Sequence, residues 1–288
     1  MGMTPTDSSV AAKALADRYV KLSKFRVHFV EAGAGPVVVL LHGSGPGATG
    51  STNFSPNIGP LSERFRVIAV DMPGWGESDP QTSETGRDHV AVLVELLDAL
   101  GIEKAALVGN SLGGMTSVAT AVKHPDRVSR LITMGVPSPA TLLFSPGNGP
   151  SEGMGALMQA YRDPSPENMK RLVQVMVYDR SFATDELAAA RSKAANGHPE
   201  HLASWNEQFT GPPQPPPYFA LGNAVCTIKA PTLLIHGRDD RVVHYENTLH
   251  LLAQIPDSRA VLLNRCGHWA QIEHADEFNR LVSAFVAA

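Results

Sequence analysis

Gly109-Asn110-Ser111-Leu112-Gly113-Gly114 is the stretch that decides the fold. The apolar run at 105–108 before it predicts a strand, and the segment 115–123 after it predicts a helix. A serine at the turn between strand and helix, with glycines two residues to either side, indicates a nucleophile elbow. The glycines are needed because this strained turn brings backbone against backbone. The start of the helix would also direct free N–H groups and the positive end of its dipole towards Ser111.

The composition is that of an ordinary globular protein. The chain has 288 residues, of which 43% are hydrophobic and 18% charged, enough for one large α/β domain or two small ones. A formal net charge of −4 and the lack of a basic run argue against a nucleic-acid partner. Cys226 and Cys266 lack metal-ligand spacing, which favours reduced thiols in a cytoplasmic protein. No signal-type segment and no run of about 18 apolar residues is found, so we expect neither export nor a membrane span.

Strand and helix patterns alternate along the chain. Continuous apolar runs at 37–41 and 65–70 predict strands buried on both faces of a parallel sheet, and further strands are predicted at 105–108, 128–136, 232–235 and 260–263. Helical periodicity occupies 90–100, 115–123 and 275–286. This alternation predicts a doubly wound, mostly parallel sheet. Residues 1 to about 20 are expected to form a loosely ordered arm, and 25–31 an edge strand.

The alternation stops after residue 136. Residues 137–150 contain four prolines and two glycines, which is typical of a hinge. Helical segments follow at 167–178, with Ser165 as the expected N-cap, and at 185–195. A proline-rich stretch at 211–217 precedes the next strand. We therefore expect a core domain of residues 1–136 and 229–288, with a helical cap inserted at 137–228.

Candidate partners for Ser111 follow later strands. A serine nucleophile needs a base within hydrogen-bond reach and an acid that holds the base in the right tautomer. After a nucleophile elbow the chain order is Ser, then Asp or Glu, then His, each on a loop past a strand. Asp239 and Asp240 follow the strand at 232–235, and His268 follows the strand at 260–263. The sequence predicts Ser111, one of these aspartates and His268 as a triad.

An oxyanion hole needs two backbone N–H donors beside the nucleophile. The residue after the nucleophile, Leu112, supplies the first. The second is expected from the loop His42-Gly43-Ser44-Gly45 after the strand at 37–41, where the small neighbours of Ser44 leave its amide accessible.

Four motifs together resemble one family over the whole chain. His42-Gly43-Ser44-Gly45-Pro46-Gly47-Ala48, the elbow, Gly237-Arg238-Asp239-Asp240-Arg241 and Cys266-Gly267-His268-Trp269-Ala270-Gln271 resemble the meta-cleavage-product hydrolases, which split carbon–carbon bonds in bacterial aromatic degradation. The resemblance implies an α/β-hydrolase fold with Asp240 as the acid of the triad. By position it also implies substrate contacts from Gly43, Asn53, Asn110, Arg191 and Trp269, and from Met176, where relatives often carry an aromatic residue.

The resemblance further implies the reaction. The substrate would be a 2-hydroxy-6-oxohexa-2,4-dienoate, cleaved between C5 and C6 to 2-hydroxypenta-2,4-dienoate and a carboxylic acid without a metal or organic cofactor. A cation such as Arg191 suits the carboxylate end of this anion, because its guanidinium can bind bidentately. We expect a cytoplasmic homo-oligomer. Two alternatives stay open: a carboxylesterase of the same fold, and a small-molecule receptor with a vestigial triad.

Overall fold

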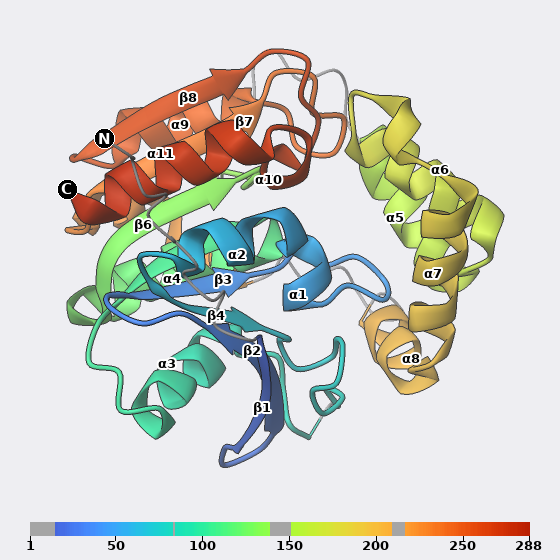
Figure 1. Ribbon diagram of the computed structural model, residues 1–288, viewed down its shortest axis with the longest axis horizontal. Coiled ribbons are helices and arrows are strands. Elements are labelled where there is room, and N and C mark those ends of the chain that lie inside the picture. Colours follow the sequence, from blue (N-terminus) through green and yellow to red (C-terminus); the bar gives the residue numbers. More distant parts are fainter. Residues whose placement is uncertain (1–14, 83, 139–150, 209–216) are drawn as a thin grey trace, which may run out of the picture.

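One eight-stranded sheet organises the molecule (Figure 1). The computed structural model describes residues 15–82, 84–138, 151–208 and 217–288. The strand order is β1-β2-β4-β3-β5-β6-β7-β8, with β1/β2 and β2/β4 antiparallel and the other pairs parallel. The strands are β1 (Ala16–Lys21), β2 (Arg26–Ala32), β3 (Val37–Leu41), β4 (Arg66–Val70), β5 (Ala105–Asn110), β6 (Val128–Met134), β7 (Thr232–Gly237) and β8 (Ser258–Leu263). The predicted mostly parallel sheet is confirmed.

Helices cover both faces of the sheet. The short α1 (Gly50–Asn53) leads into α2 (Ser55–Ser62), and α2 packs with α11 (Ala275–Ala287) against one face. On the other face lie α3 (His89–Ala99), α4 (Leu112–Lys123) and α9 (Glu246–Gln254). The central strands β5 and β7 are buried along their whole length, because both of their faces meet these helices. The fold is therefore doubly wound, as predicted.

The first strand corrects an expectation. Residues from Ala16 onward form β1, which pairs antiparallel with β2, so the expected arm is wrong from residue 16 on, and so is the expected edge position of 25–31. The strand β1 is mostly exposed and polar, so no buried alternation marks it in the sequence. Backbone pairing holds it, and the Arg26 guanidinium lies 3.7 Å from the ring centroid of Tyr19. Residues 1–14 lie outside the described residues.

A separate group of helices lies between β6 and β7 in the sequence. It comprises α5 (Glu152–Arg162), α6 (Pro166–Met176), α7 (Asp185–Asn196) and α8 (Pro199–Glu207), with the 3₁₀ turns η2 (Arg180–Phe182) and η3 (Pro217–Thr227). Figure 1 shows these helices stacked along the right of the molecule, with α5 and α6 across from β7 and β8 and α8 lower down, at the level of α1. They share an apolar cluster of their own, which also takes in Val242 and Trp269 from loops after those strands. Helices therefore do follow residue 136, as predicted.

Two details of this group bear on the predictions. Ser165 does precede α6, but its side chain makes no capping hydrogen bond and its hydroxyl contacts Asp163 at 3.3 Å instead. Most of the hinge predicted at 137–150 and of the proline-rich stretch at 211–217 lies outside the described residues.

Candidate active site

Ser111 occupies a strained turn between β5 and α4. Its φ of +51° and ψ of −112° lie in a region that non-glycine residues rarely adopt. Its N–H donates to the carbonyl of Met134 at 2.8 Å, which ties the turn to the end of β6. A side chain at Gly109 or Gly113 would overlap neighbouring backbone, so both positions require glycine. The side chain of Ser111 makes no capping hydrogen bond to α4, so its hydroxyl is not engaged by the helix.

His268 and Asp240 form a buried hydrogen-bonded pair. His268 Nδ1 lies 2.7 Å from Asp240 Oδ2, and both side chains are almost fully buried. The other carboxylate oxygen accepts from the N–H groups of Val242 and Val243 at 2.7 and 2.9 Å. Burial would by itself raise the pKa of Asp240. Its contacts with His268 and His236 outweigh burial and hold that pKa well below its usual range.

The ionised Asp240 sets the tautomer of His268. A carboxylate only accepts hydrogen bonds, so Nδ1 must carry the proton and Nε2 is left as a base. Asp239 does not share this contact. One of its oxygens lies 3.8 Å from the Arg238 guanidinium, and its side chain is partly exposed. The geometry thus identifies Asp240 as the partner of His268, a choice between Asp239 and Asp240 that spacing in the sequence could not make.

Gly135, at the end of β6, makes room for the imidazole. It has φ of +58°, and a Cβ there would lie 2.6 Å from both Nδ1 and Cε1 of His268. Sequence reasoning missed this residue. The signal that could have found it is a glycine directly after an apolar strand whose neighbour, β5, carries the nucleophile.

Asn110 links the elbow to the histidine loop. Its side-chain amide donates to the backbone carbonyl of His268 at 3.3 Å, so the two loops are held together. Within the described chain Ser111 Oγ has no hydrogen bond to His268. Such contacts are often loose in the absence of substrate and tighten when it binds.

The loop after β3 packs against the nucleophile. A Cβ at Gly43 would lie 2.9 Å from Asn110 Oδ1 and 3.4 Å from the Cβ of Ser111, so this loop passes directly over the elbow. The carbonyl of His42 accepts from the N–H of Gly113 at 3.1 Å. His42 Nε2 accepts from Met72 N–H at 3.0 Å, which requires a neutral ring, and burial lowers the pKa of His42 accordingly.

Tyr161 of α5 fixes the peptide after Ser44. Its hydroxyl donates to the Ser44 carbonyl at 2.8 Å and accepts from the indole N–H of Trp75 at 2.9 Å. Its ring stacks on Trp205 with centroids 4.4 Å apart. Sequence reasoning missed Tyr161, because it lies 117 positions from Ser44 in the chain. Leu112, the other expected donor, is the first residue of α4, where N–H groups have no partner within the helix.

Arg191 of α7 brings a positive charge to this loop. A Cβ at Gly45 would lie 3.0 Å from Arg191 Nη2, and the guanidinium carbon lies 5.1 Å from the ring centroid of Trp269. Its Nε is buried without a hydrogen-bond partner, and among the described residues no carboxylate acts on its charge. Burial lowers the pKa of Arg191 to about 10, so it remains cationic at neutral pH. A guanidinium in such surroundings is suited to binding an anion.

The remaining expected residues surround the same region. Trp269 is buried and precedes α10 (Ala270–Glu273). Asn53, at the end of α1, is buried beside Gln271, whose amide approaches its side-chain oxygen at 3.4 Å. The Met176 carbonyl accepts from the N–H of His268 at 2.7 Å, so this residue contacts the histidine loop through its backbone, and its side chain is buried in the cluster of α5 to α8.

The fold and this arrangement are those of an α/β hydrolase. The family model described as alpha/beta hydrolase fold matches residues 36–275. The chain is 44% identical to the 2-hydroxy-6-oxononadienedioate/2-hydroxy-6-oxononatrienedioate hydrolase of Cupriavidus pinatubonensis, covering 92% of this chain and 91% of that one. It is 40% identical to the 2-hydroxy-6-oxo-6-phenylhexa-2,4-dienoate hydrolase of Burkholderia cepacia, covering 99% of each.

A solved structure agrees with these relatives. The meta-cleavage product hydrolase CumD of Pseudomonas fluorescens superposes with a TM-score of 0.82 at 36% identity, over 93% of this chain and 96% of that one. The chain therefore belongs to the meta-cleavage-product hydrolases, as its motifs predicted.

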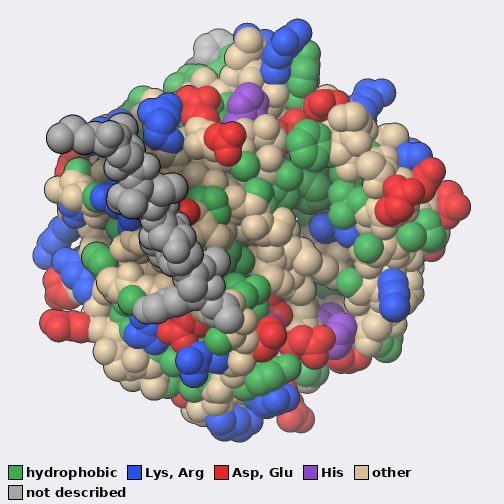
Figure 2. Space-filling view, in the orientation of Figure 1, with side chains coloured by type: hydrophobic (Ala, Val, Ile, Leu, Met, Phe, Trp, Pro, Cys, Tyr) green, Lys and Arg blue, Asp and Glu red, His purple; other side chains and the backbone are tan. Residues whose placement is uncertain are grey.

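The surface agrees with a small-molecule enzyme. Figure 2 shows acidic and basic side chains intermixed over this face, without a broad patch of one sign. Among the described residues, none of the helices combines the length and apolar character needed to cross a membrane.

Proposed function

We propose that this chain hydrolyses the C5–C6 bond of a 2-hydroxy-6-oxohexa-2,4-dienoate with Ser111, His268 and Asp240 as its triad. The observation that carries this proposal is Arg191, an enclosed and unpaired cation beside the loop that packs on the nucleophile. A neutral ester would have no use for that charge, whereas a dienoate carries a carboxylate away from the scissile bond. Relatives of the chain are named for such substrates.

The order of steps follows from the chemistry of the bond. A proton first leaves the 2-hydroxyl and a proton is added at C5, which gives the 2,6-dioxo form, because a C–C bond breaks only if the departing carbanion is stabilised. Ser111 then attacks C6 while His268 Nε2 takes its proton, and the amides of Leu112 and Ser44 hold the oxyanion. Collapse breaks C5–C6. The electron pair passes into the 2-oxo acid as an enolate, which takes up the proton from His268 to give 2-hydroxypenta-2,4-dienoate.

Water completes the turnover. It attacks the acyl group on Ser111 with His268 again as base, which releases the carboxylic acid and restores the serine hydroxyl. Direct attack of water on C6 would use the same base and the same two amides. Each step uses only groups of the chain and water.

The other residues shape the pocket in this proposal. Arg191 binds the carboxylate and the 2-oxo group and stabilises the enolate charge as it forms. Trp269 supports the guanidinium through its ring, and Gly43 leaves space for the substrate over Ser111. Asn53 and Asn110 supply polar contacts. Met176 borders the part of the pocket that receives the C6 acyl fragment.

The domain division belongs to the same proposal. Residues 1–136 and 229–288 form the catalytic core, and 137–228 form a cap that carries Arg191 and Tyr161. Contacts between the two parts support a cap that closes over the catalytic loops, since the Tyr161 hydroxyl donates to the Ser44 carbonyl and the His268 N–H donates to the Met176 carbonyl. We also propose a cytoplasmic homo-oligomer. Free thiols at Cys226 and Cys266 and the partly exposed edge strand β8 support that assignment.

A panel of ring-fission products tests the function. Dienoates that differ only at C6, with phenyl, alkyl and carboxyalkyl groups, are incubated with the enzyme while their visible absorbance is followed and products are identified by mass. We expect bleaching with formation of 2-hydroxypenta-2,4-dienoate for at least one member. Efficient cleavage of simple esters without any bleaching would establish a carboxylesterase. Saturable binding without turnover of either class would establish a receptor.

A further inference from the structure

A second cluster of chemically active side chains lies at the start of α8. His198, Glu200 and His201 each offer one ligand atom, and these three atoms lie within 4.8 Å of one another. Glu200 Oε1 is 3.3 Å from His198 Nδ1 and 3.9 Å from His201 Nε2. The two imidazoles stack nearly parallel, at 10°, with centroids 5.0 Å apart. None of these residues has a role in the proposed hydrolysis.

Within the described chain, one ring nitrogen of His201 is buried and unpaired. Its side chain is 8% exposed, and its Nε2 is buried without a hydrogen-bond partner among the described residues. A buried polar nitrogen without a partner is unfavourable, so such an atom calls for an explanation. The nitrogen faces Glu200 at a distance too long for a hydrogen bond but suited to an ion between them.

Two of the three ligand-atom separations come near those found around a metal ion, and all three lie within 4.8 Å. Two ligand atoms each about 2.1 Å from a tetrahedrally coordinated ion are about 3.4 Å apart. The 3.3 Å between Glu200 Oε1 and His198 Nδ1 already fits this value. The 3.9 Å between Glu200 Oε1 and His201 Nε2 shortens with a small rotation of the Glu200 side chain, which is 47% exposed. Two imidazoles and one carboxylate are the ligand set of zinc and related divalent transition metals, whereas calcium and magnesium prefer oxygen ligands alone.

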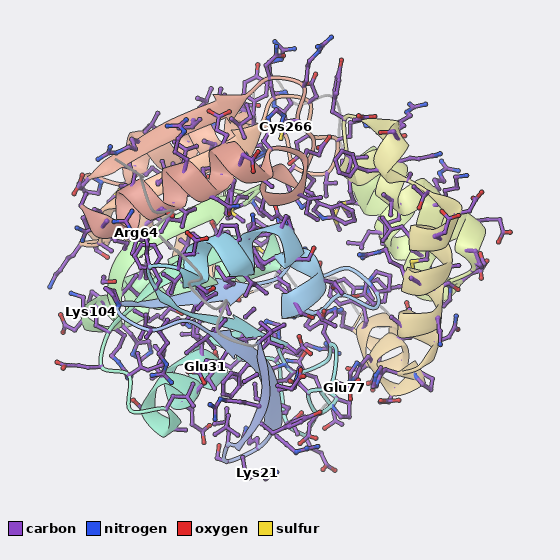
Figure 3. The ribbon with its side chains drawn as sticks, in the orientation of Figure 1. Lys21, Glu31, Arg64, Glu77, Lys104 and Cys266 are labelled. Atoms are coloured by element: carbon purple, nitrogen blue, oxygen red, sulfur yellow. The ribbon has the colours of Figure 1, made fainter. Side chains whose placement is uncertain are left out.

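Neighbouring groups would orient the two histidines. His198 Nε2 lies 3.5 Å from Glu77 Oε1, so a ring bound to metal through Nδ1 could donate its other N–H towards this carboxylate. The backbone of Ser78 lies against the imidazole of His201. Such partners to the non-ligating nitrogen are typical of metal-bound histidines. Figure 3 shows Glu77 on the side of the core that faces α8.

A route to the cluster exists. A cavity of about 130 Å³ is lined by His198 and His201 together with Gly47, Trp75, Glu77 and Tyr161, among others. Its lining does not include Ser111, His268 or Arg191. The cluster is therefore separate from the catalytic pocket and lies where α8 meets the core loops after β3 and β4.

We propose that His198, Glu200 and His201 bind one divalent transition-metal ion of the zinc class, with open positions for water towards the cavity. Through His198 and Glu77 the ion would hold the start of α8 against the core loop at 71–78. Metal binding should therefore stabilise the folded chain without taking part in the hydrolysis.

Calorimetric titration with zinc chloride tests the proposal. The untagged protein is used with Cys226→Ser as background, because that exposed thiol could bind zinc itself. We expect saturation at one ion per chain, a rise in Tm of a few degrees at excess zinc, and no response to magnesium. X-ray absorption of the zinc complex should show two imidazole ligands. Absence of saturable binding at one ion per chain overturns the proposal.

Matched variants locate the ion. Glu200→Gln and His201→Gln should weaken zinc binding at least about tenfold, and Glu77→Gln by about tenfold, the range seen when partners of metal ligands are removed. His250→Ala is the control, because His250 has a similar exposure to His198 and also faces a glutamate. Glu200→Gln changes an exposed side chain, so it keeps the test valid if His201→Gln fails to fold. Wild-type affinity in Glu200→Gln, or equal loss in His250→Ala, would refute the assignment.

Discussion

Replacing Asp240 with asparagine tests the acid of the proposed triad. Asp240 accepts two backbone N–H groups through Oδ1 and faces both His268 and His236 through Oδ2. An asparagine oxygen can keep the two backbone bonds, but its amide NH₂ then points at His268 Nδ1. Nδ1 must become an acceptor, which moves the imidazole proton to Nε2 and removes the base.

The magnitude follows from the loss of that tautomer. In serine proteases the equivalent change lowers kcat about 10⁴-fold, the worked example for this geometry. We therefore expect Asp240→Asn to lower kcat for dienoate cleavage about 10³- to 10⁴-fold, or about 4–6 kcal/mol at 1.4 kcal/mol per decade. Stopped-flow bleaching under saturating substrate measures kcat, and circular dichroism verifies that the variant is folded.

Asp239→Asn is the matched control. Asp239 is adjacent in sequence, but its contact is a partly exposed pairing with Arg238 at 3.8 Å, worth little in free energy. We expect kcat within about threefold of wild type. If Asp239→Asn is severe and Asp240→Asn is mild, the triad has been placed one residue out of register. If Asp240→Asn keeps more than a tenth of kcat, the tautomer argument fails.

Three further predictions follow from the site. Ser111→Ala and His268→Ala should each lower kcat at least about a thousandfold without loss of fold, because triad members act as a unit; retention of a tenth of kcat in Ser111→Ala would exclude it as nucleophile. Gly135→Ala would place a Cβ 2.6 Å from His268, so we expect kcat to fall about a hundredfold and stability by about 1–3 kcal/mol, and unchanged kinetics would contradict the packing. Because the pKa of Asp240 is lowered in the fold, its ionised form stabilises the chain above about pH 4 and this contribution is lost as pH falls further. Urea unfolding should therefore show Asp240→Asn as more destabilising at pH 7 than at pH 3, and an equal effect at both would contradict the lowered pKa.

The sequence specified the central part of the fold well, for a physical reason. Strands buried on both faces must be continuously apolar, so β3, β5 and β7 stand out in a single chain. The strand β1 does not, because its side chains are mostly exposed and backbone pairing alone defines it. Helices with an apolar face were located to within a few residues, as α6 and α7 show.

Only the site residues that belong to local sequence motifs could be predicted from the sequence. The elbow and the order of Asp and His follow from the chain itself, so Ser111 and His268 could be named. The choice of Asp240 needed either family resemblance or the observed contact, because adjacent residues share the same spacing. Tyr161 and Gly135 act through contacts between distant segments, which leave no periodic signal in one sequence.

The central claim is that Arg191 makes this enzyme specific for an anionic dienoate, and one ratio measures it most directly. The kcat/KM for a 6-substituted 2-hydroxy-6-oxohexa-2,4-dienoate is divided by that for p-nitrophenyl acetate, in the wild type and in Arg191→Gln. Loss of a desolvated charge contact should cost about 2–4 kcal/mol, or about 30- to 1000-fold on the dienoate. The ester should change less than about threefold. The ratio is therefore expected to fall by at least about tenfold in Arg191→Gln, with slower formation of the keto tautomer. An unchanged ratio, with both substrates losing activity equally, would contradict it and make Arg191 a structural residue.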